Sequence, residues 1–105
     1  MADVDALTAI AEPTRRRIVD ALRMRECSVT DLVELLRMSQ PAISKHLRVL
    51  REAGVVRAEA YAQKRIYRLI PEPFRELDAW LTPYRRLWTT HLAALEEHLS
   101  RGDQS

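Results

Sequence analysis

The middle of the chain concentrates side chains that can bind a polyanion. Residues 37–68 carry eight arginine and lysine side chains against only Glu52 and Glu59, a net charge of +6. The segments on either side, residues 1–36 and 69–105, each carry −2, so the +2 of the whole chain conceals this pattern. Because neutralising phosphates releases counterions, a basic segment between two acidic flanks predicts binding to nucleic acid.

Several polar side chains of this segment are suited to reading bases or holding phosphates. An amide such as Gln40 can pair with adenine, and Lys45 or Arg48 can pair with guanine or a phosphate. Lys64 and Arg65 are expected to contact the DNA backbone or the minor groove, which positions a protein without specifying sequence. The alternative is that all of them form the solvated side of a helix and a hairpin. The predicted DNA-binding residues are Ser39, Gln40, Pro41, Ser44, Lys45, His46, Arg48, Arg51, Lys64 and Arg65.

The residue patterns that enzymes need are sparse. Cys27 is the only cysteine, and with three scattered histidines it makes a poor catalytic triad. There is no glycine-rich phosphate loop, no zinc-protease helix and no nucleophile elbow, so we expect no enzyme. A lone cysteine forms no internal disulfide, and neither a signal-peptide pattern nor an apolar run of about 18 residues occurs. We therefore expect a cytoplasmic protein without a membrane partner.

The basic side chains fall on elements that apolar spacing defines. Thr30 is the predicted N-cap of one helix and Ser39 that of the next, with a tight turn between them. In the second helix apolar residues recur every three or four positions over 43–50, and Gly54 is a natural stop. Two helices joined in this way predict a helix-turn-helix over about residues 30–53.

Two strands are predicted directly after these helices. The segments VVRAEAY (55–61) and RIYRLI (65–70) are rich in β-branched and aromatic residues. Residues 62–64 connect them without a glycine, so we expect a loop longer than a two-residue primed turn. A basic hairpin at this place predicts a wing over about residues 55–70.

The remainder of the chain predicts a long amphipathic helix over about residues 73–100. Apolar side chains step by three and four from Phe74 to Leu99, close to a heptad seam. Pro83 is expected to kink this helix or to divide it. The stripe either folds back on its own domain or packs on a second copy, and a winged body of about 60 residues is too small to cover it. The predicted dimer interface comprises Leu7, Ile10, Leu77, Leu81, Tyr84, Trp88, Leu92 and Leu95.

Together these elements predict a single domain over residues 1–105, since the chain is too short for a second core. The fold class is mainly α with a small β-hairpin wing, a winged helix-turn-helix of order α-α-α-α-β-β-α that dimerises through its terminal helices. The expected partner is double-stranded DNA. A winged domain that binds only proteins is the alternative, and salt-dependent DNA binding distinguishes the two.

One family shares these motifs. The segment SQPAISKHLRVLREAGVV (39–56) resembles the recognition helix of ArsR/SmtB-type repressors, which carry S-x-P-x-[IV]-S-[KR]-H-L and then L-x-x-[AS]-G-[LI]-[VI]. EPTRRRIVDAL (12–22) and RIYRLIPE (65–72) resemble that family's second helix and outgoing wing strand. The resemblance covers residues 7–100. It implies a homodimeric repressor on an inverted-repeat operator at its own or a neighbouring promoter, with His46 as part of the DNA-binding motif.

Many members of that family release DNA when a metal or metalloid binds, and this sequence departs from both of their known sites. A Cys-x-Cys pair at the start of the third helix corresponds here to Ser28 and Thr30. Cys27 stands one residue away and alone. A lone cysteine of this kind is more often a small core residue than a sensor.

The second family site lies on the C-terminal helix. Asp78 and His91 keep its spacing of thirteen, but Trp80 and Ala94 stand at the other two ligand positions. Because zinc takes four ligands, we expect no metal and no cofactor. The protein is then an autoregulatory or constitutive repressor, or one relieved by an unidentified small-molecule effector. The alternative is a sensor with a non-standard site at Asp78 and His91, or at Cys27.

Overall fold

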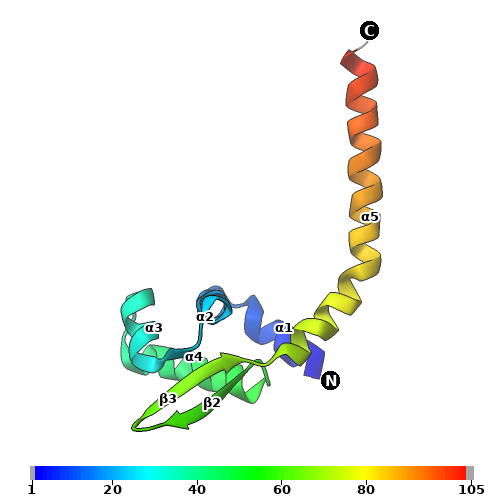
Figure 1. Cartoon of the computed structure of the whole chain (residues 1–105). Helices are drawn as coiled ribbons and strands as arrows, with labels where there is room; N and C mark the ends of the chain where they lie inside the picture. Colours follow the sequence, from blue (N-terminus) through cyan, green and yellow to red (C-terminus); the bar gives the residue numbers. More distant parts are fainter. Residues whose placement is uncertain (1, 104–105) are drawn as a thin grey trace.

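The computed structural model describes residues 2–103, with side chains described for residues 5–102. Four helices and a small sheet form a winged body, and a long helical arm projects from it (Figure 1). The predicted mainly α-helical winged fold is therefore confirmed, with one strand more than expected. The elements are α1 (Ala2–Ala11), α2 (Pro13–Met24), β1 (Cys27–Ser28), α3 (Val29–Leu36), α4 (Gln40–Glu52), β2 (Val56–Tyr61), β3 (Lys64–Leu69) and α5 (Pro71–Asp103).

A single apolar core holds α4 in place. Ile18 of α2, Leu32 of α3 and Ile43 of α4 are completely buried, and Val55 closes the core where the sheet begins. Burying each such side chain contributes about 1.5–3 kcal/mol to folding. These residues fix one side of α4 and leave the opposite side to solvent.

Both ends of α4 are capped as the sequence predicts. The Ser39 hydroxyl accepts a hydrogen bond from the N–H of Ala42 at 3.3 Å. At the other end, the N–H groups of Gly54 and Val55 donate back to α4 carbonyls at 3.1 and 2.9 Å. Gly54 has φ of 76°, in the left-handed region that closes such a helix end. Local residue types therefore determine where this helix begins and ends.

The start of α3 differs from the prediction. Its N-cap is Ser28, not Thr30, and the cap is reciprocal. The Ser28 hydroxyl accepts from the N–H of Asp31 at 3.1 Å, and the Asp31 carboxylate accepts from the N–H of Ser28 at 2.9 Å. Thr30 has no acidic residue three positions later with which to complete such a pair.

The sheet has three strands, not two, in the antiparallel order β1-β3-β2. The strand that was not predicted is β1, which pairs with β3: Cys27 lies opposite Tyr67, and Ser28 lies opposite Ile66. Two residues are too few to show an alternating pattern, and their partners lie far along the chain. This strand attaches the wing to the start of α3.

The hairpin turn is also tighter than predicted. Tyr61 pairs with Lys64, so only Ala62 and Gln63 form the loop. Ala62 adopts φ of 58°, the left-handed conformation that a primed turn needs at its first position. The expectation of a longer loop was wrong because the sheet register imposes this conformation on a residue that is not glycine.

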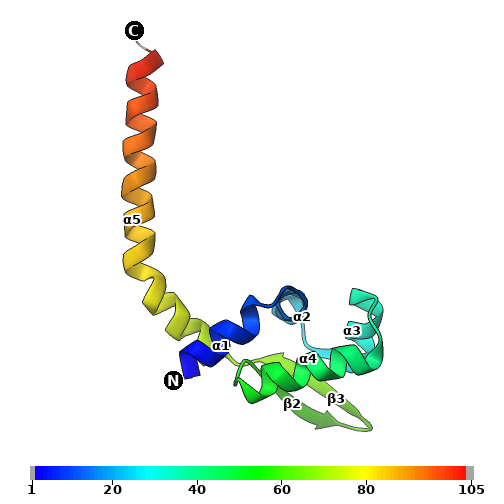
Figure 2. The ribbon, with the colours of Figure 1, turned by 180° about the vertical axis from the view of Figure 1, so that it is seen from behind.

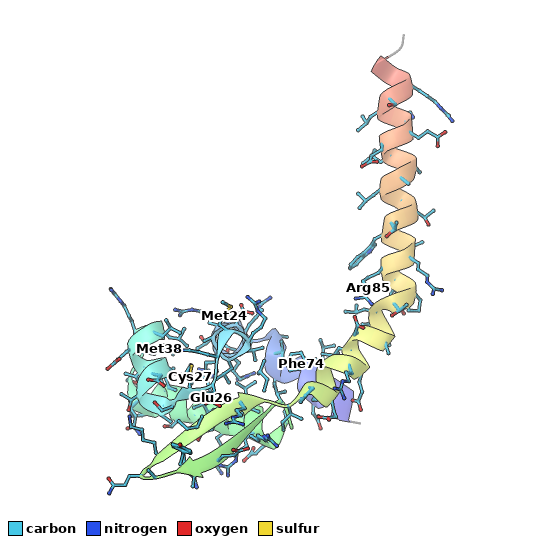
Figure 3. The ribbon with its side chains drawn as sticks, viewed as in Figure 1. Met24, Glu26, Cys27, Met38, Phe74 and Arg85 are labelled. Carbon is cyan, nitrogen blue, oxygen red and sulfur yellow. The ribbon has the colours of Figure 1, made fainter. Side chains whose placement is uncertain are left out.

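The arm, α5, is one continuous helix with Pro83 inside it. Its first turns pack against α1, where Phe74 lies half-buried against the core. Below the labelled Arg85 the helix bends, and the remaining turns extend away from the body (Figures 2 and 3). Pro83 therefore kinks the helix and does not divide it. No helix in the described part of the chain has the length and apolar character to cross a membrane.

Candidate DNA interface

The outward side of α4 carries most of the predicted DNA-binding residues. Ile43 and Leu47 are buried beneath it, and Lys45 between them is exposed. Ser44 is half-buried at the edge of this side. The exposed members of the predicted set on or next to α4 are Ser39, Gln40, Pro41, Lys45, Arg48 and Arg51.

A cleft separates α4 from the wing. Its volume is about 550 Å³, and its walls come from α4, from β3 and from the start of α3. The structure therefore places side chains of the predicted recognition helix and of the predicted wing on one concave surface. The residues that line it are Val29, Gln40, Ser44, Leu47, Arg48, Arg51, Glu52, Arg65 and Tyr67.

The outer face of the wing neutralises its own cations. Arg57 lies 3.1 Å from the Glu59 carboxylate, and Arg68 lies 2.5 Å from Glu26 and 3.9 Å from Glu59. Alternate side chains of a strand point to opposite faces, so these pairs lie on the side away from the buried Tyr67. The two arginines of the outer face are therefore compensated. By the same alternation, Lys64 at the wing tip lies on this face, and it has no carboxylate within 4.0 Å in the described chain.

The side towards the cleft keeps its charge. Only Arg48 there has an ion pair, at 3.2 Å from Glu52, and both side chains are largely exposed. Such a surface pair contributes about 0–1 kcal/mol, so a phosphate can replace the carboxylate. Within residues 5–102, five basic side chains of the central segment have no carboxylate within 4.0 Å, namely Arg37, Lys45, Arg51, Lys64 and Arg65.

His46 differs from the other predicted DNA-binding residues. Its side chain is 21% exposed, and its Nδ1 is buried 3.8 Å from the carboxylate of Glu12, at the start of α2. Helical periodicity contains this signal, since His46 lies three residues after Ile43 and four before Leu50. The structure places it at the inner edge of α4.

The Glu12 carboxylate has a second role. It accepts a hydrogen bond from the N–H of Arg15 at 2.8 Å and so caps α2. This bond is the main reason why the pKa of Glu12 lies below its ordinary value, and the nearby charge of His46 lowers it further. The carboxylate beside His46 is therefore ionised at neutral pH.

The predicted dimer residues lie in two settings. Ile10, Leu77 and Leu81 are half-buried, and Ile10 packs against the core, whereas Leu7 on α1 is exposed. Beyond the bend, every described apolar side chain of α5 is exposed, and Trp88 is 58% exposed. Three further large apolar residues of the predicted stripe, Trp80, Leu87 and Leu99, are also exposed but are not among the predicted interface residues.

The two remnants of family metal sites have other surroundings. The Asp78 carboxylate lies 2.6 Å from the guanidinium of Arg85, one bend away from the turns that carry His91. The Cys27 thiol is buried in β1, and this burial, followed by the nearby charge of Asp31, raises its pKa. Among the described residues, no three histidine, cysteine or acidic side chains are grouped to hold a metal ion.

A capped helix that presents polar and basic side chains beside a basic hairpin defines a winged helix-turn-helix domain. Residues 12–58 match the sequence profile described as bacterial regulatory protein, arsR family. The HTH-type transcriptional regulator Rv2034 of Mycobacterium tuberculosis is 36% identical over 101 residues, which cover 95% of this chain and 92% of that protein. The chain belongs to the ArsR/SmtB family of DNA-binding transcriptional regulators, which are not enzymes.

Two further comparisons agree with this membership. The HTH-type transcriptional repressor SmtB of Mycobacterium tuberculosis is 42% identical over 65 residues, which are 62% of this chain but only 48% of that protein. A crystal structure of a possible transcriptional regulator for arsenical resistance is 40% identical and superimposes with a TM-score of 0.68. That superposition covers 82% of this chain and 95% of the other.

Proposed function

We propose that this chain is a homodimeric repressor that binds an inverted-repeat operator, acting as one domain over residues 1–105. The observation that carries the proposal is the cleft between α4 and β3, where Arg51 and Arg65 have no acidic partner in the described chain. A rigid concave surface with uncompensated cations suits the phosphate backbone beside a major groove.

The side chains of this surface have different roles in the proposal. Gln40 and Ser44 lie in the first turns of α4, the part that enters the groove, and they contact base edges. Arg48 contacts a guanine or a phosphate from the next turn. Lys64, beside the wing tip, contacts the backbone and binds all sequences alike.

The second copy is proposed to cover α5. Seven large apolar side chains of α5 are about half exposed or more, and Leu7 on the neighbouring α1 continues the same surface. Fully burying one such side chain contributes about 1.5–3 kcal/mol, so leaving all of them in water is unfavourable. Pairing of two arms through this stripe buries them and places two copies of α4 in one assembly. The exposed α5 residues are Trp80, Tyr84, Leu87, Trp88, Leu92, Leu95 and Leu99.

We also propose that neither known metal site of the family operates here. The Asp78 carboxylate is engaged by Arg85, and Cys27 is a buried thiol with a raised pKa. Repression is then autoregulatory or constitutive, or it is relieved by an organic effector. Titration of zinc, nickel, cadmium and arsenite into the protein–DNA complex tests this, because a tenfold loss of DNA affinity abolished by His91→Ala contradicts it.

Selection of bound duplexes from a random-sequence pool tests the main proposal. The expected product is an inverted repeat whose half-sites lie in successive major grooves. Arg48→Ala should weaken binding to the selected duplex by about 1–3 kcal/mol. Lys64→Ala should weaken binding to selected and unselected duplexes equally. If both variants bind as the wild type does, the wrong surface has been placed on the DNA.

A further inference from the structure

We propose that DNA binding by this protein takes up one proton per chain at His46, whose imidazole links α4 to the start of α2 through Glu12. The inference rests on the proposed DNA-binding function and adds a regulation by pH that operates within the DNA-binding surface itself.

The position of His46 connects two surroundings. Its Nδ1 is buried 3.8 Å from the Glu12 carboxylate and has no hydrogen-bond partner in the described part of the chain. The ring is nevertheless 21% exposed, and the neighbouring Lys45 faces solvent. One edge of the imidazole therefore faces the Glu12 carboxylate, and the rest of the ring is partly open to solvent beside Lys45.

The neutral and charged forms of the ring differ in what they offer at this place. A buried nitrogen without a hydrogen-bond partner is unfavourable. Protonation places an N–H on Nδ1, directed towards an ionised carboxylate, and makes the other nitrogen a donor as well. A DNA phosphate near α4 then leaves the imidazolium between two anions, which favours the charged form. Histidine is the side chain that ordinarily changes its charge between about pH 5 and 8.

The charged groups around His46 support the assignment to this residue. From the start of α2, the Glu12 carboxylate faces it, and the lowered pKa of Glu12 means that this carboxylate is ionised already. From α1, Asp5 lies beside the C-terminal half of α4, near Val49 and Glu52. Neither α1 nor α2 brings a second histidine to this place.

The two remaining elements packed against α4 add no competing group. The core residues of α3 and β2 meet α4 through apolar side chains. The Asp31 carboxylate of α3 is occupied by its reciprocal cap, which lowers its pKa. Arg57 and Glu59 of β2 pair with each other. The other histidines, His91 and His98, lie on the arm, which projects away from α4 (Figure 1).

Titration calorimetry with a mixed-sequence duplex of about 30 base pairs at low salt tests the inference. Repeating the titration near pH 7 in buffers of different ionisation enthalpy gives the number of protons exchanged. The expected result is an uptake approaching one proton per bound chain, with affinity falling by up to about tenfold per pH unit per chain as the pH rises through neutrality. The uptake should be lost in His46→Gln and retained in His98→Gln, a matched change on the arm.

Two further variants separate proton linkage from folding. His46→Lys keeps a positive charge, so it should bind DNA without proton uptake and with little dependence on pH between 6 and 8. Glu12→Gln removes the carboxylate and should reduce the uptake. Binding without proton uptake in the wild type, or unchanged uptake in His46→Gln, overturns the inference and leaves DNA binding intact. Absence of DNA binding at every pH contradicts the proposed function as well.

Discussion

The winged body and the arm beyond Pro83 expose opposite kinds of surface. In the body, three large apolar side chains of α4 are buried, namely Ile43, Leu47 and Leu50. The large apolar side chains that the body exposes stand on separate elements and are Leu7, Met24, Leu35 and Tyr61. In the arm, one side of α5 carries tryptophan, tyrosine and leucine in water (Figure 3). The body has completed its core and retains charge for a polyanion, whereas the arm has nothing of its own to pack against. This difference underlies the proposal that the body binds DNA and the arm binds a second copy of the chain.

The largest effect is expected from a charge on the arm. Leu95 is 52% exposed in the single chain, so Leu95→Glu should leave the fold of the body unchanged. In a pair of arms the carboxylate enters an apolar interface twice, at a cost of several kcal/mol. We expect self-association to weaken at least a thousandfold by analytical ultracentrifugation.

The matched control for this change is Ala93→Glu. Two residues are about 200° apart around a helix, so this position lies nearly opposite Leu95. Its association should stay close to that of the wild type. A Leu95→Glu variant that remains dimeric, or a wild type that sediments as a monomer at micromolar concentration, contradicts the comparison.

The next largest effect is expected in the core of the body. Leu47 is buried beneath the recognition side of α4, so Leu47→Ala leaves a cavity and should lower the free energy of unfolding by about 2–5 kcal/mol. Urea denaturation at two protein concentrations measures this loss. The loss is expected to be independent of concentration, unlike any loss caused by a variant of the arm, and a concentration-dependent loss would place Leu47 at an interface.

A smaller effect, on DNA affinity, is expected from the difference between an unpaired arginine in the cleft and a paired arginine on the outer face of the wing. Arg51 lines the cleft without an acidic partner in the described chain, whereas Arg57 on the outer face pairs with Glu59. Arg51→Ala should weaken DNA binding about tenfold. It should also reduce, by about one, the slope of the logarithm of the binding constant against the logarithm of the salt concentration. Arg57→Ala should change neither quantity. Equal effects of the two substitutions, measured by fluorescence anisotropy at several salt concentrations, would mean that both faces of the hairpin meet DNA.

The smallest effect is expected at the start of α4. Ser39→Ala removes the hydroxyl that accepts from the N–H of Ala42, and it should cost about 1 kcal/mol of unfolding free energy. Thermal unfolding followed by circular dichroism measures this. Ser39→Asp replaces the acceptor and is the matched control. A loss of DNA affinity greater than the loss of stability would show that Ser39 also contacts DNA.

The parts of the fold that sequence predicted correctly are those with a local signal. Ser39 and Gly54 mark the two ends of α4, because each end of a helix needs a specific residue type. The recurrence of apolar residues every three or four positions predicted which side of the helix is buried. The cap of α3 carries a local signal too, since Ser28 is followed three positions later by Asp31, although the predicted cap was the later Thr30. Residue patterns therefore located the recognition helix and misplaced the start of its neighbour by two residues.

The parts that sequence did not predict depend on distant pairing. The short β1 exists because Cys27 meets Tyr67, and Ala62 takes a left-handed conformation because the register of the hairpin demands it. The division of the wing cations into paired and unpaired ones also needs the fold, since Glu26 reaches Arg68 only across the sheet. The inward position of His46 was within reach of helical spacing and was overlooked.

The bend at Pro83 has a consequence for the geometry of the operator. The turns before it are fastened to α1, and the turns after it are the proposed seat of the partner, so its angle governs how far apart two recognition helices stand. Beyond Pro83 the helix continues for about 30 Å, and a change of about ten degrees displaces its far end by about 5 Å. That displacement exceeds the rise of one base pair, about 3.4 Å. The bend at Pro83 thus sets the distance between the two recognition helices of the proposed dimer. Replacing Pro83 with alanine should therefore change which spacing between half-sites is preferred.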